Sequence, residues 1–144
     1  MRDKVFDLAL EFYLSTKSGP KVNNDTKLQA KNILVYGDKR LSGIGAELRK
    51  KAQKLADSVI QAHETMMLWN SCKDGIGVYD LYTAKSIKKP SQGAFDAAWD
   101  VIHTGVSIHQ AAVAHKVNYQ SIKVLKPRIE KYISFAERLN KLQN

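Results

Sequence analysis

An apolar residue recurs at every third or fourth position from Ile44 to Met66, and this seam constrains the fold more than any other feature. The spacing is that of one face of a continuous α-helix. No glycine or proline interrupts residues 46–68, so we expect a single long helix there. The seam consists of Ile44, Leu48, Ala52, Leu55, Val59, Ala62 and Met66.

Helical periodicity also dominates the rest of the chain. No alternating strand pattern of useful length is present, so the sequence predicts an all-α fold. Gly37 and Gly105 stand where two of the helices should end, and Pro90 and Ser91 separate two others. The predicted inward faces are Val5, Leu8, Ala9 and Phe12; Leu28, Ile33, Leu34 and Tyr36; Val78, Leu81 and Tyr82; and Phe95, Ala98, Trp99 and Ile102.

The two halves of the chain contain similar segments. “VFDLAL” at 5–10 is matched by “VYDLYT” at 78–83. In both halves an amphipathic segment then runs through a glycine into a serine, Ser42 or Ser107, that can begin the next helix. A tandem duplication is one interpretation and chance similarity of short segments is the other.

Length and composition indicate a folded protein of one or two small domains. The chain has 144 residues, of which 44% are hydrophobic and 26% charged. Two glycines and Asp74 break the helical pattern near its middle, so we predict an N-terminal unit over 1–70 and a C-terminal unit over 71–144. Cys72 is the only cysteine, which fits a reducing compartment. With neither a signal peptide nor a membrane-spanning apolar run, we expect a soluble, cytoplasmic protein.

The net charge of +9 is concentrated in two separated clusters. Residues 39–54 contain six basic residues and one acidic residue, and residues 107–144 contain seven basic and two acidic residues. The intervening segment, 55–106, has four basic and six acidic residues. An excess of this kind favours a polyanionic partner without identifying it.

Residues 107–126, “SIHQAAVAHKVNYQSIKVLK”, predict two helices joined by an abrupt turn. Ser107 can cap the first helix over 108–115, and Asn118 can cap the second after a turn at 116–117. A helix-turn-helix needs a small residue where its helices nearly touch, an apolar residue at the corner, and two more that seat the second helix. The residues at those spacings are Ala112, Val117, Ile122 and Leu125.

Three residues depart from that template. Lys116 stands at the turn position where glycine is commonest, and it must adopt a left-handed backbone that costs roughly 1–2 kcal/mol. His115 occupies an inward-facing site. Pro127 lacks an amide donor, so we expect the second helix to end or kink there. Beyond it lies an apolar stripe that can pack on its own domain or pair with a second subunit: Ile129, Tyr132, Ile133, Ala136 and Leu139.

The outward side chains of the second helix are suited to the DNA major groove. Amide side chains can bond adenine edges, and lysine can contact guanine or a phosphate. Helix N-termini and nearby amines hold the phosphodiester backbone. A solvated polar face on a structural helix is the alternative. We predict that the DNA-binding surface comprises Ser107, Asn118, Tyr119, Gln120, Ser121, Lys123, Lys126 and Arg128.

An amphipathic helix, then “LVYG” or “VIHTG”, then a helix-turn-helix resembles the KorA/TrfB-type plasmid transcriptional repressors. More loosely, the pattern resembles other small phage and plasmid regulators. The resemblance is clearest over 94–133 and extends less clearly to 27–66. It implies a dimeric operator-binding repressor whose base-reading residues correspond to Asn118, Gln120, Ser121 and Lys123.

The first half has two interpretations. “LSGIGAELRKKAQKLADSVIQAH” can form an equivalent two-helix motif, but its unbroken seam favours one long helix. Lys50, Lys51 and Lys54 would then contact phosphates or stay solvated. If both halves bind DNA, a monomer covers two adjacent sites. If only the second does, the long helix is a natural seam for a homodimer on a two-fold symmetric site.

Signatures of enzymatic chemistry are not found. The four histidines form no i, i+4 pair, and no phosphate loop, nucleophile elbow or HExxH motif occurs, so we expect no enzyme, metal or cofactor. The leading interpretation is a sequence-specific double-stranded DNA-binding regulator, a repressor acting by operator occupancy. The alternative is a small helical adaptor that binds a host protein through Tyr79, Tyr82 and Tyr119.

Overall fold

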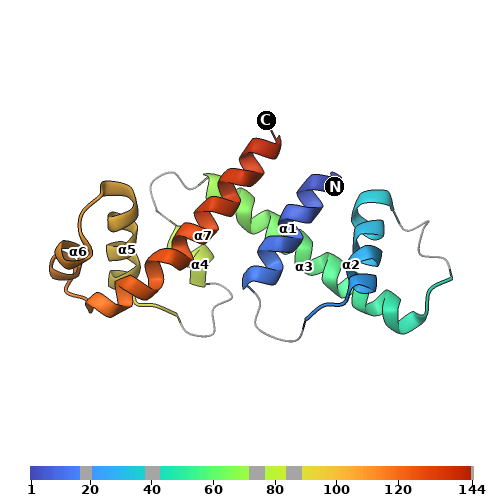
Figure 1. The fold of residues 1–144 in the computed structure, drawn as a ribbon, viewed down its shortest axis with the longest axis horizontal. Helices are drawn as coiled ribbons and strands as arrows, with labels where there is room; N and C mark the ends of the chain where they lie inside the picture. Colours follow the sequence, from blue (N-terminus) through green and yellow to red (C-terminus); the bar gives the residue numbers. More distant parts are fainter. Residues whose placement is uncertain (17–20, 38–42, 72–76, 84–88, 144) are drawn as a thin grey trace. The chain divides into compact units, whose positions relative to one another are not determined.

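A computed structural model describes residues 1–16, 21–37, 43–71, 77–83 and 89–143. All regular structure in these residues is helical (Figure 1), which confirms the all-α prediction. The helices in chain order are α1 (Asp3–Thr16), α2 (Asn24–Lys31), η1 (Asn32–Tyr36, a π-helix), α3 (Ala46–Ser71), α4 (Val78–Thr83), α5 (Gln92–Thr104), α6 (Ile108–His115) and α7 (Tyr119–Gln143).

Some residues used in the sequence predictions lie outside the described part of the chain. They are Ser42, Cys72 and Asp74, together with residues 39–41 of the first basic cluster. Within the described part, no helix combines the length and the apolar character needed to cross a bilayer.

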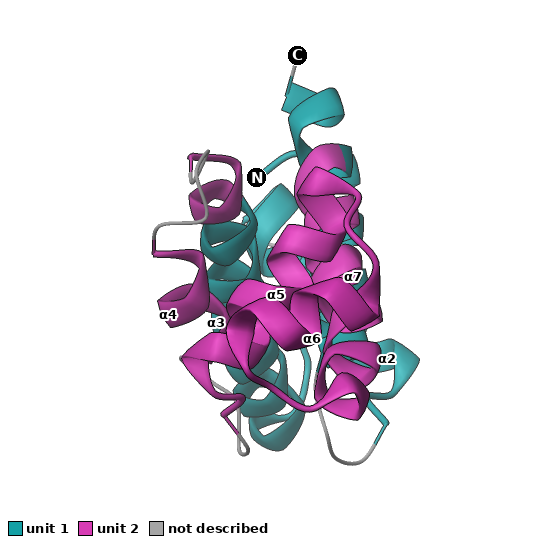
Figure 2. Ribbon diagram, turned by 90° about the vertical axis from the view of Figure 1, so that its left-hand side faces the viewer, with its two compact units in different colours: residues 1–66, 138–144 teal, residues 67–137 magenta. Residues whose placement is uncertain are grey.

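The chain forms two compact units (Figure 2). Unit 1 comprises residues 1–66 and 138–144, and unit 2 comprises residues 67–137. The predicted division at 70–71 had placed the whole C-terminal tail in the second half. The tail instead ends in unit 1, where Leu139 is fully buried and Arg138 binds the Glu11 carboxylate of α1 through two hydrogen bonds of 3.2 and 2.9 Å.

α3 is the uninterrupted helix that its seam predicted. The five seam residues from Ala52 to Met66 are buried, and Leu48 is half-buried. The equivalent two-helix motif considered for the first half is therefore wrong. Because the chain's own core covers this seam, the seam is not available to a second subunit, and the predicted homodimer needs another surface. The tandem duplication stays a prediction.

The second helical segment differs from its prediction. Leu28 and Tyr36, expected inward, are 54% and 44% exposed, while α2 buries Thr26 and Ala30. The helix widens into the π-turn η1, and the larger turn shifts the phase of the side chains that follow. A single 3.6-residue spacing therefore does not predict which side chains of α2 and η1 face inward. Gly37 ends η1 with a φ of 81°, as expected.

α1 buries its predicted stripe and adds Phe6 to it. Lys31, at the end of α2, forms ion pairs with Asp3 and, at 3.2 Å, with Asp7. These carboxylates raise the pKa of Lys31 and keep it charged, chiefly because Asp3 accepts a hydrogen bond from the Lys31 ammonium. The N-terminal turns of α1 are thereby joined to α2 within unit 1.

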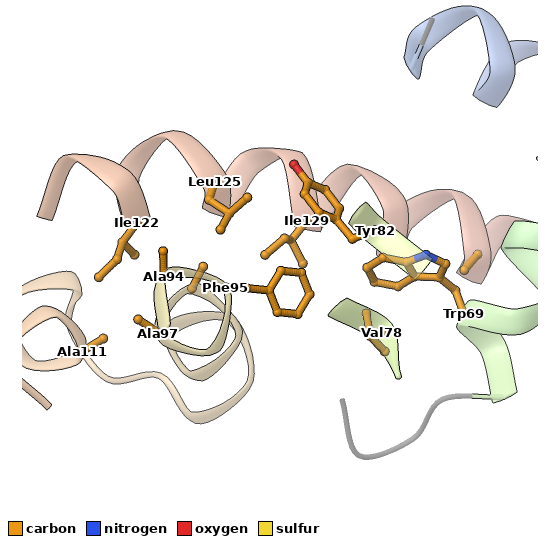
Figure 3. Packing of buried hydrophobic residues seen from close by; sticks show 12 residues of the cluster. Trp69, Val78, Tyr82, Ala94, Phe95, Ala97, Ala111, Ile122, Leu125 and Ile129 are labelled. Atoms are coloured by element: carbon orange, nitrogen blue, oxygen red, sulfur yellow. The ribbon is translucent and has the colours of Figure 1, made fainter. Parts of the chain in front are cut away.

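One side of α7 closes the core of unit 2 (Figure 3). Ile122, Leu125 and Ile129 are buried and point toward Ala94 and Phe95 of α5. The burial of Ile122 and Leu125 confirms that they seat the second helix. Ala136, farther along the predicted stripe, belongs to the same core, so the stripe packs back onto its own chain.

α7 does not end at Pro127 but continues through it. Pro127 lies on the exposed side of the helix. The carbonyl of Lys123, which loses its amide partner to the proline, can therefore bind water instead. This position explains why the helix tolerates a proline that was expected to interrupt it.

The aromatic residues of α4 face the core. Tyr82, which helical spacing placed inward and the adaptor alternative needs at the surface, is 7% exposed, with ring centroids 5.6 Å from Phe95 and 5.3 Å from Tyr132. Burial raises the pKa of Tyr82, and the charge of Arg128 and its hydrogen bond offset part of that rise. The Tyr79 hydroxyl donates to the carbonyl of Pro90 at 2.6 Å. The exposed aromatic surface considered for an adaptor is therefore wrong at Tyr82, and Tyr79 is half-buried.

Burial of His63 predicts an acid-sensitive fold. Its Nε2 atom is buried without a hydrogen-bond partner among the described residues. Burial lowers the pKa of His63, and the negative charge of Glu64 offsets part of that decrease. Because the folded state favours the neutral ring, the unfolded state binds the proton more tightly. The free energy of unfolding should fall as the pH drops below about 6.5, the usual pKa of histidine.

Urea denaturation between pH 7.5 and 5 tests this expectation. The His63→Gln variant should lose part of the pH dependence, whereas a variant of the exposed His103, His103→Gln, should keep all of it. Identical pH dependence in the wild type and in His63→Gln would contradict the assignment.

Candidate nucleic-acid interface

α6 begins and ends at the predicted residues, and a reciprocal cap fixes its start. The Oγ atom of Ser107 accepts a hydrogen bond from the amide of Gln110 at 3.1 Å, and the Oε1 atom of Gln110 accepts from the amide of Ser107 at 3.1 Å. Ser107 is exposed, and this arrangement uses its hydroxyl as an acceptor only. The hydroxyl hydrogen can therefore donate to an acceptor on a ligand.

The turn after α6 is left-handed at Lys116, as predicted, with φ 54° and ψ 46°. The amide of Val117 donates to the carbonyl of Ala112 at 3.0 Å, which closes the turn. The Oδ1 atom of Asn118 then accepts from the amide of Gln120 at 2.8 Å, confirming Asn118 as the cap of α7. Local hydrogen bonds therefore set the direction in which α7 leaves.

α5 supports this turn through two contacts that the sequence predictions missed. The Nε2 atom of His115 lies 2.6 Å from the Oδ2 atom of Asp100. A Cβ atom at Gly93 would lie 3.1 Å from the Cγ1 atom of Val117, so a larger residue there would require Val117 to move by a few tenths of an ångström. A glycine in the first turn of a predicted helix was the only sequence signal. Asp100, the partner of His115, is fifteen residues away in the chain, and no sequence pattern pointed to this pair.

The outward side of α7 lies opposite its buried residues. Gln120 and Lys123 are exposed there, one helical turn apart. Val124, which the sequence predictions missed because it is apolar, lies on the same side and is 52% exposed. The other predicted residues of α7 and its cap are Asn118, Ser121 and Arg128, which are exposed, and Tyr119 and Lys126, which are half-buried.

Three of these residues are already engaged within the chain. The ring of Tyr119 stacks on His109 of α6, with centroids 4.5 Å apart. Lys126 pairs with Glu130 at 3.1 Å, and Arg128 hydrogen-bonds the buried Tyr82. Lys123, in contrast, has no ion-pair partner among the described residues. The side chains ready to meet a ligand therefore lie in the first two turns of α7.

No acidic residue occurs from Val101 to Ile129, a segment that covers α6, the turn and the first turns of α7. Four basic residues lie within it. The helix N-termini at Ser107 and Asn118 add partial positive charge near the same residues. The surface therefore favours an anionic ligand.

The predicted lysines of the first half lie in unit 1. Lys50, Lys51 and Lys54 are exposed on the N-terminal turns of α3, and Lys51 lies 3.8 Å from Glu47. They form a second basic surface, which belongs to a different unit from the surface on α6 and α7.

No group of three or more histidine, cysteine, aspartate or glutamate side chains that could hold a metal ion is found among the described residues. No known protein family, curated protein or solved structure matches the chain.

The left-handed turn predicts a stabilising substitution. Lys116→Gly should raise the free energy of unfolding by about 1 kcal/mol, because glycine adopts this backbone without the Cβ clash, although its unfolded chain is more flexible. Lys116→Ala is the matched control, since it removes the charge but keeps the Cβ atom. Equal stability of the two variants in urea denaturation would show that Lys116 is not strained.

Proposed function

We propose that the chain is a sequence-specific double-stranded DNA-binding protein that regulates transcription, acting as a repressor by occupying an operator. In this proposal α6, the turn and α7 form a helix-turn-helix, and α7 is the recognition helix. The observation that carries the proposal is the exposed pair Gln120 and Lys123 on the first turns of α7, next to the capped turn at Asn118.

The dimensions of the groove suit this surface. The major groove is about 12 Å wide, and a helix with its side chains is roughly 10–12 Å across. Gln120 can bond the N6 and N7 atoms of an adenine, and Lys123 can donate to the acceptors of a guanine. Both side chains are exposed on the part of α7 nearest the turn.

Contacts with the phosphate backbone would hold α7 in register without reading sequence. The capped N-terminus of α6, with the hydroxyl of Ser107, is suited to one phosphate. Lys126 and Arg128 lie farther along α7 and add positive charge, although each also has a partner in the chain.

The resemblance of residues 94–133 to the KorA/TrfB-type repressors supports the same function. It also supports a homodimer, in which a two-fold axis would present two recognition helices to half-sites one turn of DNA apart. A single helix reads only a few base pairs, so a dimer with two recognition helices would be more specific than a monomer. A two-fold symmetric DNA site would indicate that the protein binds as a dimer.

A second candidate function is a protein-binding adaptor. Met67 and Leu68, adjacent on α3, are 47% and 50% exposed. These two residues favour a protein contact, but isolated exposed apolar residues are common. The buried Tyr82 removes the strongest support that this function had. A stoichiometric complex with a host protein, together with no preference for any duplex, would favour the adaptor.

Selection of bound sequences from a random duplex pool tests base recognition. The wild type should enrich one site, and Gln120→Ala should relax discrimination at one base pair of that site by roughly 1–3 kcal/mol. Gln143→Ala, at the far end of the same helix, should leave the enriched site unchanged. An unaltered base preference for Gln120→Ala would exclude Gln120 as a base-reading residue.

The basic surface of α3 gives a different prediction. If Lys50 and Lys54 contact phosphates, replacing both with alanine should weaken the selected and a scrambled duplex by the same factor. Each lost contact should also reduce the slope of log K against log salt concentration by about 1. Lys21→Ala, an exposed lysine elsewhere in unit 1, is the control. An unchanged salt slope in the double variant would show that these lysines stay solvated.

A further inference from the structure

Val124 is an apolar side chain on an otherwise polar recognition surface. It is 52% exposed, although it lies next to the buried Leu125 in the chain. Gln120 is one turn before it on the same side of α7, and Lys123 is adjacent. An apolar side chain at this place gains nothing from water, and the core of unit 2 is already closed by Ile122 and its neighbours.

The major groove presents one apolar group, the C5-methyl of thymine, and aliphatic side chains recognise it by contact. The two methyl groups of valine can cover such a methyl and remove it from water. Lys123, which precedes Val124, and Gln120, one turn earlier, have no comparable way to recognise the methyl group of thymine. The chemistry of this side chain therefore matches thymine specifically.

The spacing along α7 relates this contact to that of Gln120. Four residues of helix advance about 6 Å, and successive base pairs are 3.4 Å apart. A thymine methyl beneath Val124 would therefore lie within about two base pairs of the base that Gln120 reads.

We propose that Val124 is a specificity-determining residue that reads the C5-methyl of a thymine in the bound site. This inference rests on the proposed function, since it requires α7 to enter the major groove. It predicts that the bound DNA site requires a thymine close to the base that Gln120 contacts. Hydrogen bonds from polar side chains alone would not impose this requirement.

The experiment replaces thymine with deoxyuridine, which lacks only the methyl group and keeps its hydrogen-bonding edge. The site selected by the wild type is synthesised with deoxyuridine at each thymine in turn, and the affinity of the full-length protein is measured for each duplex. One position in each copy of the recognised sequence should lose roughly fourfold in affinity, the value of one buried methylene-sized group.

Two variants separate this contact from a general effect on DNA shape. Val124→Ala should bind the thymine and deoxyuridine duplexes equally well. Val113→Ala, in which the replaced valine is 79% exposed on α6, should keep the wild-type difference between them. Circular dichroism melting of both variants verifies that each remains folded.

The outcomes distinguish this inference from the proposed function. If no sequence is enriched, sequence-specific DNA binding fails and the inference fails with it. If a site is enriched but no thymine is sensitive to deoxyuridine, Val124 does not read a methyl group while the function stands. Sensitivity that persists in Val124→Ala also overturns the inference, because another residue or the shape of the DNA must then cause it.

Discussion

The burial of one side of α7 against α5 determines what the rest of the candidate interface can present. Ile122, Leu125 and Ile129 close the core of unit 2, which leaves the opposite side of the helix in solvent. Because side chains on a helix repeat every 3.6 residues, fixing these three also fixes the direction of Gln120 and Val124. The exposed side is therefore a consequence of the core.

Small residues make this packing possible. Ala94, Ala97 and Ala98 of α5 and Ala111 of α6 are all buried, and alanine lets neighbouring helices approach closely. Larger side chains at these positions would push the helices apart or force strained rotamers. Gly93 extends the same constraint to the turn, where even one added carbon would meet Val117. The candidate interface is thus held by a core in which several of the buried side chains are alanines.

Features encoded by neighbouring residues could be predicted from the sequence. The limits of α6, the cap at Ser107 and the left-handed Lys116 all follow from residues a few positions apart. The seam of α3 was predictable because its periodicity is uninterrupted. The pairing of His115 with Asp100 depends on a tertiary contact, so no local pattern contained it. Val124 was missed for a different reason, since the predicted DNA-binding surface was chosen from side chains that can form hydrogen bonds.

The most direct measurement is an NMR titration of the ¹⁵N-labelled protein with the selected duplex and with a scrambled duplex of the same composition. The proposal predicts that amide shifts specific to the selected duplex cluster at Gln120, Ser121, Lys123 and Val124 in the first turns of α7. Shifts that cluster instead around Met67 and Leu68 of α3, or that are identical for the two duplexes, would contradict α7 as a sequence-reading helix.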